Sequence, residues 1–360
     1  MKKSIILCNT YYQLIFAIQM RLTILHNDSV DIIITDQSLN AASVVKRLEK
    51  ESLFNRCFYV ETKKMTLSRN KLRNVYAVFE GTVGASIFNE IVDIYDRVFI
   101  HNFDIASYAL FASLYRNNKK IEVNRYEEGI ISYRNIEAPS KKKNLVKVLR
   151  KAFRWNILEE QCENFYCFFP DFYQGDYRSI RIEPIDSTGE ISSILKRVFD
   201  VHITENDYKE KYIYFTSVYD FEGGSPIHEY DLVSKISKLV GKDNLIIKMH
   251  PRDSRGLYEK GGFTIDQHST IPWKVIQLCM DFSDKVLLST NSTSIVSTNL
   301  MTSKGAEAYY TYKLCDINGN AAAIKTTGII NELLSDEIMS KKLSRVHIAN
   351  NIMELLQNNE

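Results

Sequence analysis

Short apolar runs alternate with longer stretches of helical spacing along most of this chain, and this alternation restricts the fold more than any other feature. In the first half, the apolar runs are residues 4–9, 30–35, 57–60, 98–101 and 121–123. Stretches with helical spacing lie between them, at residues 12–26, at 41–51, within 67–94, and at 106–115. The pattern is typical of βαβ units, whose strands are parallel. It predicts an α/β fold.

The second half repeats the alternation. Its predicted strands are residues 212–216, 245–249, 263–265 and 286–289, and its predicted helices are residues 229–240, 272–280 and 293–300. A last amphipathic helix is expected at residues 341–356. Residues 155–186, which contain Pro170 and Pro184, have weaker periodicity and are interpreted as the connection between two domains. We therefore expect one domain at residues 1–170 and another at residues 171–360.

Composition and charge exclude several classes of protein. The length of 360 residues allows about two domains, and the formal net charge of +2 gives no whole-molecule reason to bind nucleic acid. The six cysteines have no metal-ligand spacing, which is typical of reduced thiols in the cytoplasm. The apolar run after Lys2 and Lys3 is too short for a signal peptide, and no run approaches the roughly 18 apolar residues of a membrane span. We expect a cytoplasmic protein.

One strongly basic segment begins at Lys141 and ends at Trp155 (residues 141–155). On a helix, its apolar side chains would share one face and its lysines and arginines would cover the rest. Such a helix suits the surface of an anionic membrane, which would make the protein peripheral to the inner face of the plasma membrane. The alternative is an amphipathic helix that packs on the core with its charges in water.

The loop after the first predicted strand lacks the glycines that a dinucleotide requires. A GxGxxG turn would let a pyrophosphate approach the backbone, and no GxxxxGK[ST] loop occurs elsewhere in the chain. The polar side chains present instead, which suit the hydroxyl groups of a sugar, are Asn9, Thr10, Tyr11 and Gln13. We predict an acceptor-side sugar contact here, with a simple helix cap as the alternative.

Two adjacent carboxylates, Glu127 and Glu128, precede Gly129 at the end of a predicted strand. Neighbouring side chains of a strand alternate in direction, so at least one of the two can face a ligand. Like charges this close raise one of the two pKa values, which suits a general base. The alternative is a solvated acidic turn.

A histidine, His250, follows the apolar strand at residues 245–249 and precedes Pro251. In an open α/β sheet, ligands bind where strands end. An imidazole at that place can donate a proton or a hydrogen bond to a departing phosphate oxygen. The alternative is a structural histidine.

A cluster of hydroxyl groups follows the strand at residues 286–289 and precedes an apolar helix. Its members are Ser289, Thr290, Ser292, Thr293 and Ser294. Hydroxyls and free amides at a helix N-terminus hold a phosphate without a metal, whereas an ordinary N-cap needs only one such residue. No DxD or HExxH motif and no His/Cys cluster is present, so we predict no metal site.

Three motifs in this order, Glu127-Glu128-Gly129, then His250-Pro251, then the Ser/Thr stretch from Ser289, resemble those of bacterial sialyltransferases. The opening at residues 10–14, Thr-Tyr-Tyr-Gln-Leu, is similar to that of glycosyltransferase family fifty-two, which includes lipooligosaccharide and capsule sialyltransferases, and to that of bacterial polysialyltransferases. The resemblance covers nearly the whole chain. It implies a GT-B architecture of two Rossmann-like domains that face each other across a cleft.

The resemblance also implies the chemistry. The donor would be CMP-sialic acid, held mainly by the C-terminal domain, and the acceptor a galactose-terminated surface glycan, with no cofactor, no metal and inversion at the anomeric carbon. Glu127 or Glu128 would deprotonate the acceptor, His250 would protonate or stabilise the leaving phosphate, and the Ser/Thr stretch would hold that phosphate. In some family members the base comes from the C-terminal domain, which here would be one of Asp220, Glu222, Glu229 and Asp231. Lys274, in Pro272-Trp273-Lys274, departs from the acidic residue expected there.

Several alternative functions are also compatible with these motifs. Another GT-B transferase could use CMP-Kdo or a UDP-hexose, and a sugar-nucleotide isomerase or hydrolase could share the same two domains. A non-catalytic glycan-binding or nucleotide-binding module is the third class. The linkage, the acceptor, the choice between one sugar and a polymer, and the choice between monomer and homodimer are left undecided by the sequence.

Overall fold

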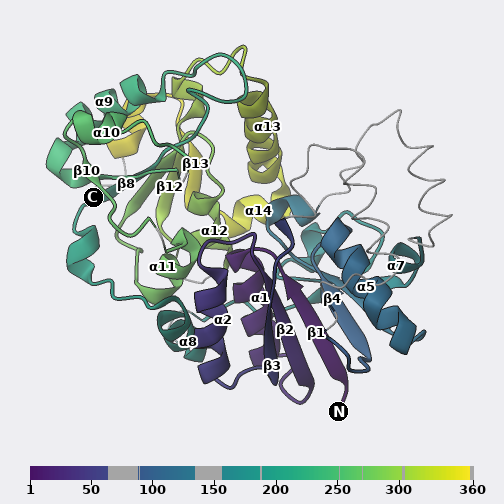
Figure 1. Ribbon diagram of the computed structural model, residues 1–360. Helices are drawn as coiled ribbons and strands as arrows, with labels where there is room; N and C mark the ends of the chain where they lie inside the picture. The colour runs from purple at the N-terminus through teal and green to yellow at the C-terminus, as the bar shows by residue number, and fades with distance from the viewer. Residues whose placement is uncertain are drawn as a thin grey trace. The chain divides into compact units, whose positions relative to one another are not determined.

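The computed structural model describes residues 1–63, 88, 90–133, 156–186, 189–250, 252–269, 271–301 and 305–356. The chain divides into two compact units, each built on one parallel sheet (Figure 1). The first unit is Met1–Glu183 with Arg197–Phe199, and the second is Pro184–Lys196 with Asp200–Glu360. The α/β prediction is confirmed.

The first unit contains a seven-stranded parallel sheet with the order β3-β2-β1-β4-β5-β6-β7. Its strands are β1 (Lys3–Cys8), β2 (Ser29–Thr35), β3 (Arg56–Val60), β4 (Arg97–Ile100), β5 (Glu122–Tyr126), β6 (Cys162–Cys167) and β7 (Arg178–Arg181). Its described helices are α1 (Tyr11–Leu22), α2 (Ala41–Lys50), α5 (Ile105–Asn117) and α7 (Asn156–Glu160). The strand order reverses between β1 and β4, and such a reversal is where open α/β sheets bind ligands.

The second unit contains a six-stranded parallel sheet with the order β10-β9-β8-β11-β12-β13. Its strands are β8 (Tyr212–Phe215), β9 (Leu245–Lys248), β10 (Thr264–Ile265), β11 (Val286–Ser289), β12 (Glu307–Tyr310) and β13 (Val346–Ile348). The helices are α9 (Glu229–Val240), α10 (Leu257–Lys260), α11 (Trp273–Cys279), α12 (Ser294–Met301), α13 (Ala321–Ser335) and α14 (Glu337–Lys342), while α8 (Glu190–Phe199) ends in residues that cluster with the first unit. Here the order reverses between β8 and β11.

Burial explains why the strands could be predicted. Every residue of β8, β9 and β11 is buried, as expected for a parallel sheet covered on both faces. Tyr214, Ile247 and Leu288 from these strands pack with Val233 and Ile236 of α9 in one hydrophobic cluster. Uninterrupted apolar runs are the sequence signature of such strands.

One prediction about local structure is wrong, and another is incomplete. Residues 341–356 do not form an amphipathic helix, because α14 ends at Lys342 and Val346–Ile348 form the strand β13 beside β12. The free edge of β12 offers backbone hydrogen bonds to this β-branched segment, and those bonds outweigh the helical spacing. Residues 155–186 are not only a connection, since they contain β6 and β7, which extend the first sheet.

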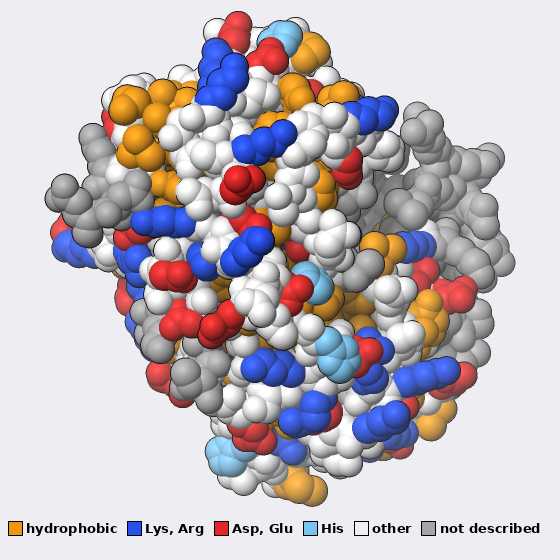
Figure 2. All heavy atoms as spheres, turned by 90° about the vertical axis from the view of Figure 1, so that its left-hand side faces the viewer, with side chains coloured by type: hydrophobic (Ala, Val, Ile, Leu, Met, Phe, Trp, Pro, Cys, Tyr) orange, Lys and Arg blue, Asp and Glu red, His pale blue; other side chains and the backbone are white. Residues whose placement is uncertain are grey.

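Some predictions fall on residues outside the described ranges. They are most of the helix expected within 67–94, the basic segment from Lys141 to Trp155, and Pro251. Within the described ranges, no helix combines the length and the apolar character that crossing a membrane requires. On the face drawn in Figure 2, basic and acidic side chains of the described residues are intermixed.

Candidate active site

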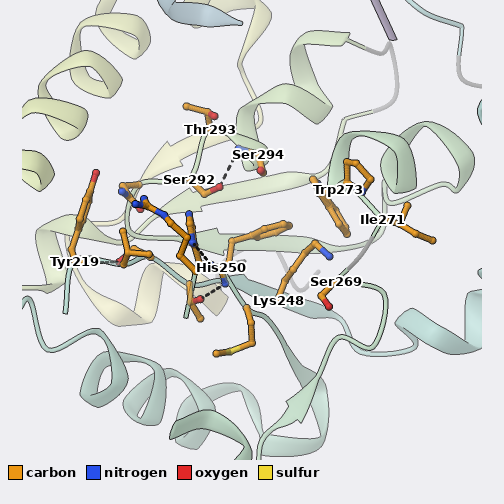
Figure 3. Close-up of a pocket in the computed structure, with 17 residues that line it drawn as sticks. Tyr219, Lys248, His250, Ser269, Ile271, Trp273, Ser292, Thr293 and Ser294 are labelled. Atoms are coloured by element: carbon orange, nitrogen blue, oxygen red, sulfur yellow. Dashed lines mark hydrogen bonds between the residues drawn. The ribbon is translucent and has the colours of Figure 1, made fainter. Parts of the chain in front are cut away.

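A pocket of about 430 Å³ opens in the second unit, at the carboxyl ends of the strands β8, β9 and β11. The loops after these strands and the start of α11 form its walls, as Figure 3 shows. The reversal of strand order between β8 and β11 makes room for it, because the helices that follow these two strands diverge there. The volume suits a small organic ligand.

The structure brings two of the three sequence motifs together in this pocket. His250 lines it from the loop after β9, and Ser292, Thr293 and Ser294 line it from the loop after β11 (Figure 3). These segments are far apart in the sequence and meet only because β9, β8 and β11 are neighbours in the sheet.

Two backbone hydrogen bonds fix the position and the tautomer of His250. The amide of His250 donates to Thr216 Oγ1 at 2.8 Å, and the amide of Arg252 donates to His250 Nδ1 at 3.1 Å. A ring nitrogen that accepts carries no hydrogen, so the neutral ring holds its proton on Nε2. Burial lowers the pKa of His250 below its ordinary value, and the positive charge of Arg252 lowers it further. The half-buried ring is therefore a neutral donor at pH 7.

A second hollow, of about 590 Å³, lies beside the pocket and shares Met249, His250 and Ser269 with it. Carboxylates from Asp253, Glu259 and Asp266 contribute to its walls. His250 thus lines both hollows.

Changing Arg252 to Gln should raise the pKa of His250, because it removes the positive charge that opposes protonation and releases Glu222, which favours protonation. The backbone bond to Nδ1 stays, so the tautomer should be unchanged. Titration of the His250 ring by NMR measures the shift. The matched control is Arg181→Gln, which breaks a comparable exposed ion pair with Asp171 in the first unit and should leave His250 unaffected. A pKa that stays or falls in Arg252→Gln would contradict the assigned cause.

Only part of the Ser/Thr stretch faces the pocket. Ser289 is fully buried, where its hydroxyl donates to the Phe215 carbonyl at 2.9 Å and accepts from the amides of Asn291 and Ser292. Thr290 is also buried and donates to the carboxylate of Glu229 at 2.6 Å. These two hydroxyls hold the loop in place, and they leave Ser292, Thr293 and Ser294 as the groups that line the pocket.

Positive electrostatic character at this end of the pocket comes from α12. The helix begins at Ser294, so its first amides and the positive end of its dipole lie at the pocket wall. Lys248 also lines the pocket, but its ammonium is buried in an ion pair with Asp266, and burial lowers the pKa of Lys248. Among the described residues, no group of three or more His, Cys, Asp or Glu side chains is arranged to hold a metal ion.

The acidic residues expected as an alternative base lie elsewhere in the second unit, and none of them lines this pocket. Asp220 accepts from the amide of Glu229 at the start of α9, and Glu222 pairs with Arg252 at 2.7 Å. Glu229 is buried and fully engaged by hydroxyl and amide donors. Asp231 is exposed in the first turn of α9.

In the first unit, Glu127 and Glu128 have opposite environments. Glu127 is 3% exposed and accepts hydrogen bonds from the hydroxyls of Tyr12 and Tyr133 and from the Phe168 amide. Glu128 is half-buried, and among the described residues the side-chain amide nitrogens of Gln13 and Asn102 lie near its Oε2, each at 3.4 Å. No cation within the described ranges forms an ion pair with Glu128, so Glu128 is the better placed of the two to accept a proton.

The loop after β1 is mainly a helix cap. Thr10 caps α1, and Gln13 Oε1 accepts from the amides of Asn9 and Thr10, at 2.6 and 3.1 Å. Tyr11 donates its hydroxyl to the Leu39 carbonyl. Because the oxygen of the Gln13 amide is occupied by backbone donors, its nitrogen must point toward Glu128. The capping box thus orients the group that touches the candidate base.

A polar cluster of Asn9, His101 and Asp104 lies at the reversal between β1 and β4, and the sequence motifs did not mark its histidine and aspartate. His101 Nε2 and Asp104 Oδ2 lie 3.1 and 2.9 Å from Asn9 Nδ2. Burial alone would raise the pKa of Asp104, but hydrogen bonds from His101 and Ser107 bring it below its ordinary value. His101 was visible in the sequence as the last residue of a predicted strand, but only the strand order shows that β4 lies next to β1.

In the second unit, the sequence motifs also did not indicate that the loop after β8 forms one wall of the pocket. Thr216, Ser217 and Tyr219 line it from that loop, and the buried Trp273 lines it from α11. Of the tripeptide Pro272-Trp273-Lys274, Pro272 and Trp273 therefore line the pocket, and Lys274 does not.

The family described as alpha-2,8-polysialyltransferase (POLYST) matches residues 4–304. No curated protein has a significant sequence match to the chain. Among solved structures, an alpha/beta-galactoside alpha-2,3-sialyltransferase from Photobacterium phosphoreum is similar with a TM-score of 0.50 and 13% identity, over 98% of this chain and 98% of that one. A sialyltransferase from Photobacterium damsela has a TM-score of 0.48 and 12% identity, over 97% of this chain and 81% of that one. The two-domain GT-B fold is shared.

Proposed function

The chain belongs to the alpha-2,8-polysialyltransferase family and is a glycosyltransferase of the GT-B type, and we propose that it transfers sialic acid from CMP-sialic acid to a surface glycan of capsule or lipooligosaccharide. The reaction proceeds with inversion and needs neither a metal nor a cofactor. The observation that carries the proposal is the pocket in which His250 meets Ser292, Thr293, Ser294 and the first turn of α12. That combination of neutral donors suits a phosphate ester.

The phosphate of CMP occupies this pocket in the proposed reaction. The bond between the anomeric carbon of sialic acid and the phosphate oxygen breaks, and the electron pair leaves with CMP. Charge builds on that oxygen, and hydrogen bonds from His250 Nε2 and from the hydroxyls and amides of the Ser292 loop stabilise it. The fixed tautomer of His250 favours hydrogen-bond donation over transfer of a full proton.

The acceptor hydroxyl attacks the anomeric carbon from the side opposite the phosphate, which inverts the configuration. Glu128 takes the proton of that hydroxyl as the new bond forms. Gln13 and Asn102 hold the carboxylate without neutralising its charge. Glu127 keeps a structural role at the end of β5, because its carboxylate accepts from the buried residues Tyr12, Tyr133 and Phe168.

Two acceptors are candidates. The motif resemblance favours a galactose-terminated glycan, and the name of the matching family favours a glycan that already ends in sialic acid. A lipid-linked acceptor would bring the enzyme to the inner face of the plasma membrane, and the basic segment from Lys141 to Trp155 is the sequence feature that supports this.

A donor screen tests the proposal directly. We expect release of CMP from CMP-sialic acid only when an acceptor is present, with the same rate after treatment with EDTA. Lactose and sialyllactose serve as matched acceptors that differ by one terminal sialic acid, so their rates separate the two acceptor candidates.

Turnover of CMP-Kdo or of a UDP-hexose in place of CMP-sialic acid would remove the proposed donor. Conversion of the nucleotide sugar at the same rate with and without acceptor would instead indicate an isomerase or hydrolase. Binding of CMP-sialic acid without any turnover would point to a binding module.

A further inference from the structure

The buried carboxylate of Glu229 connects three segments of the second unit. Glu229 is the first residue of α9 and is 1% exposed. Its Oε2 accepts from the amide and the hydroxyl of Ser217, at 2.7 and 2.9 Å. Its Oε1 accepts from the hydroxyls of Thr290 at 2.6 Å and Tyr214 at 3.2 Å. Four donors thus converge on one side chain.

Two of these donor residues belong to loops that form opposite parts of the pocket wall. Ser217 lies in the loop after β8 and lines the pocket itself. Thr290 lies in the loop after β11 and directly precedes the lining residues Asn291 and Ser292. The strands β8 and β11 are the neighbours between which the strand order reverses. Glu229 therefore ties one wall to the other behind the pocket.

Only an ionised carboxylate can accept from all four donors, because it has two acceptor oxygens and no hydrogen. Hydrogen bonds to a charged acceptor are stronger than neutral ones, so this connection is a stiff one. Burial, together with the nearby charge of Asp220, raises the pKa of Glu229, and the hydrogen bonds from Thr290 and Ser217 oppose that rise. Glu229 has no ion pair with a cation in the described part of the chain, so the hydroxyl and amide donors alone hold the charge.

We propose that Glu229 is a positioning residue that locks the loop after β8 to the loop after β11 and thereby sets the width of the pocket for its ligand. It acts through Ser217 and Thr290 and does not touch the ligand. The identity of that ligand as CMP rests on the proposed function, whereas the connection between the loops does not.

Hydrogen exchange in the unliganded full-length chain tests the connection without any ligand. Thr290→Val removes the hydroxyl and keeps the shape, and Thr290→Ser keeps the hydroxyl. We expect Thr290→Val to speed exchange by at least about tenfold in residues 289–294 and also in residues 216–219, which lie on the other side of Glu229. Thr290→Ser should behave as the wild type.

Tyr214→Phe is the matched control. It removes another donor to the same carboxylate, but Tyr214 lies within β8 and does not line the pocket. Its exchange at residues 289–294 should stay at the wild-type rate, even if the global stability falls. Unchanged exchange at residues 216–219 in Thr290→Val would overturn the proposal, and so would equal effects of Thr290→Val and Tyr214→Phe on the pocket loops.

Calorimetric titration with CMP then reports the consequence for the site. We expect roughly tenfold weaker binding in Thr290→Val and in Glu229→Gln, and wild-type affinity in Thr290→Ser and Tyr214→Phe. If the wild type binds no CMP while the exchange pattern is as expected, the proposed donor fails and the connection stands. If the wild type binds CMP and Thr290→Val binds it equally well, the positioning role fails and the proposed function stands.

Discussion

His250→Ala should lower the turnover number by about two to four powers of ten, the combined range for groups that donate a hydrogen bond or a proton to developing charge on an oxygen. The substitution removes the Nε2–H donor and also the Nδ1 acceptor of the Arg252 amide, while the bond from the backbone amide of residue 250 to Thr216 is retained and should hold the loop after β9. Steady-state rates with CMP-sialic acid and a saturating acceptor measure the effect. His202→Ala makes the same change at an exposed histidine that pairs with Asp200, and it should be nearly silent.

His250→Gln separates two roles of the imidazole. The amide nitrogen of glutamine reaches close to the place of Nε2 and can donate a hydrogen bond, but it cannot transfer a proton at neutral pH. Partial recovery of the rate relative to His250→Ala would support hydrogen-bond donation. Equal loss in both variants would support proton transfer, and wild-type rates in both would remove His250 from the mechanism.

Glu128→Gln should lower turnover by a similar factor, about two to four powers of ten, because an amide cannot accept the acceptor's proton. Glu128 is half-buried, and its contacts with Gln13 and Asn102 are long, so the free energy of unfolding of the variant should hardly change. The binding of CMP, which needs only the second domain in the proposed reaction, should be unaffected. Turnover and denaturant unfolding are measured on the same preparation.

Glu127→Gln is the matched variant at the neighbouring position, with the opposite expectation. Its amide would have a single oxygen for the donors Tyr12, Tyr133 and Phe168, so the free energy of unfolding should fall by about 1–3 kcal/mol. A large loss of turnover without loss of stability in Glu127→Gln would reverse the assignment of the two glutamates. If neither variant loses turnover, the base lies in the second domain, and Asp220 is the next residue to change.

For the adjacent glutamates, the sequence alone does not predict which of the two side chains is buried. The motif contains both residues, and because successive side chains of a strand alternate, the two are expected to point to opposite faces of the sheet. Which glutamate is buried depends on two tyrosines that donate to Glu127. Tyr12 in α1 precedes β5 in the sequence, and Tyr133 follows it. The same holds for Ser289 and Thr290, whose hydroxyls are chemically equal to those of Ser292 to Ser294 but face the Phe215 carbonyl and Glu229.

The sequence by itself determined the α/β class, the buried strands with their uninterrupted apolar runs, and the ends of strands at which polar residues collect. These are local properties, because a strand that is buried on both faces of a parallel sheet needs apolar residues at nearly every position. The tertiary structure alone decided the strand order, the extension of the first sheet by β6 and β7 and of the second by β13, and the meeting of His250 with the Ser292 loop. Those outcomes depend on which backbone edge or buried donor is free in space, and partners that are distant along the chain decide that.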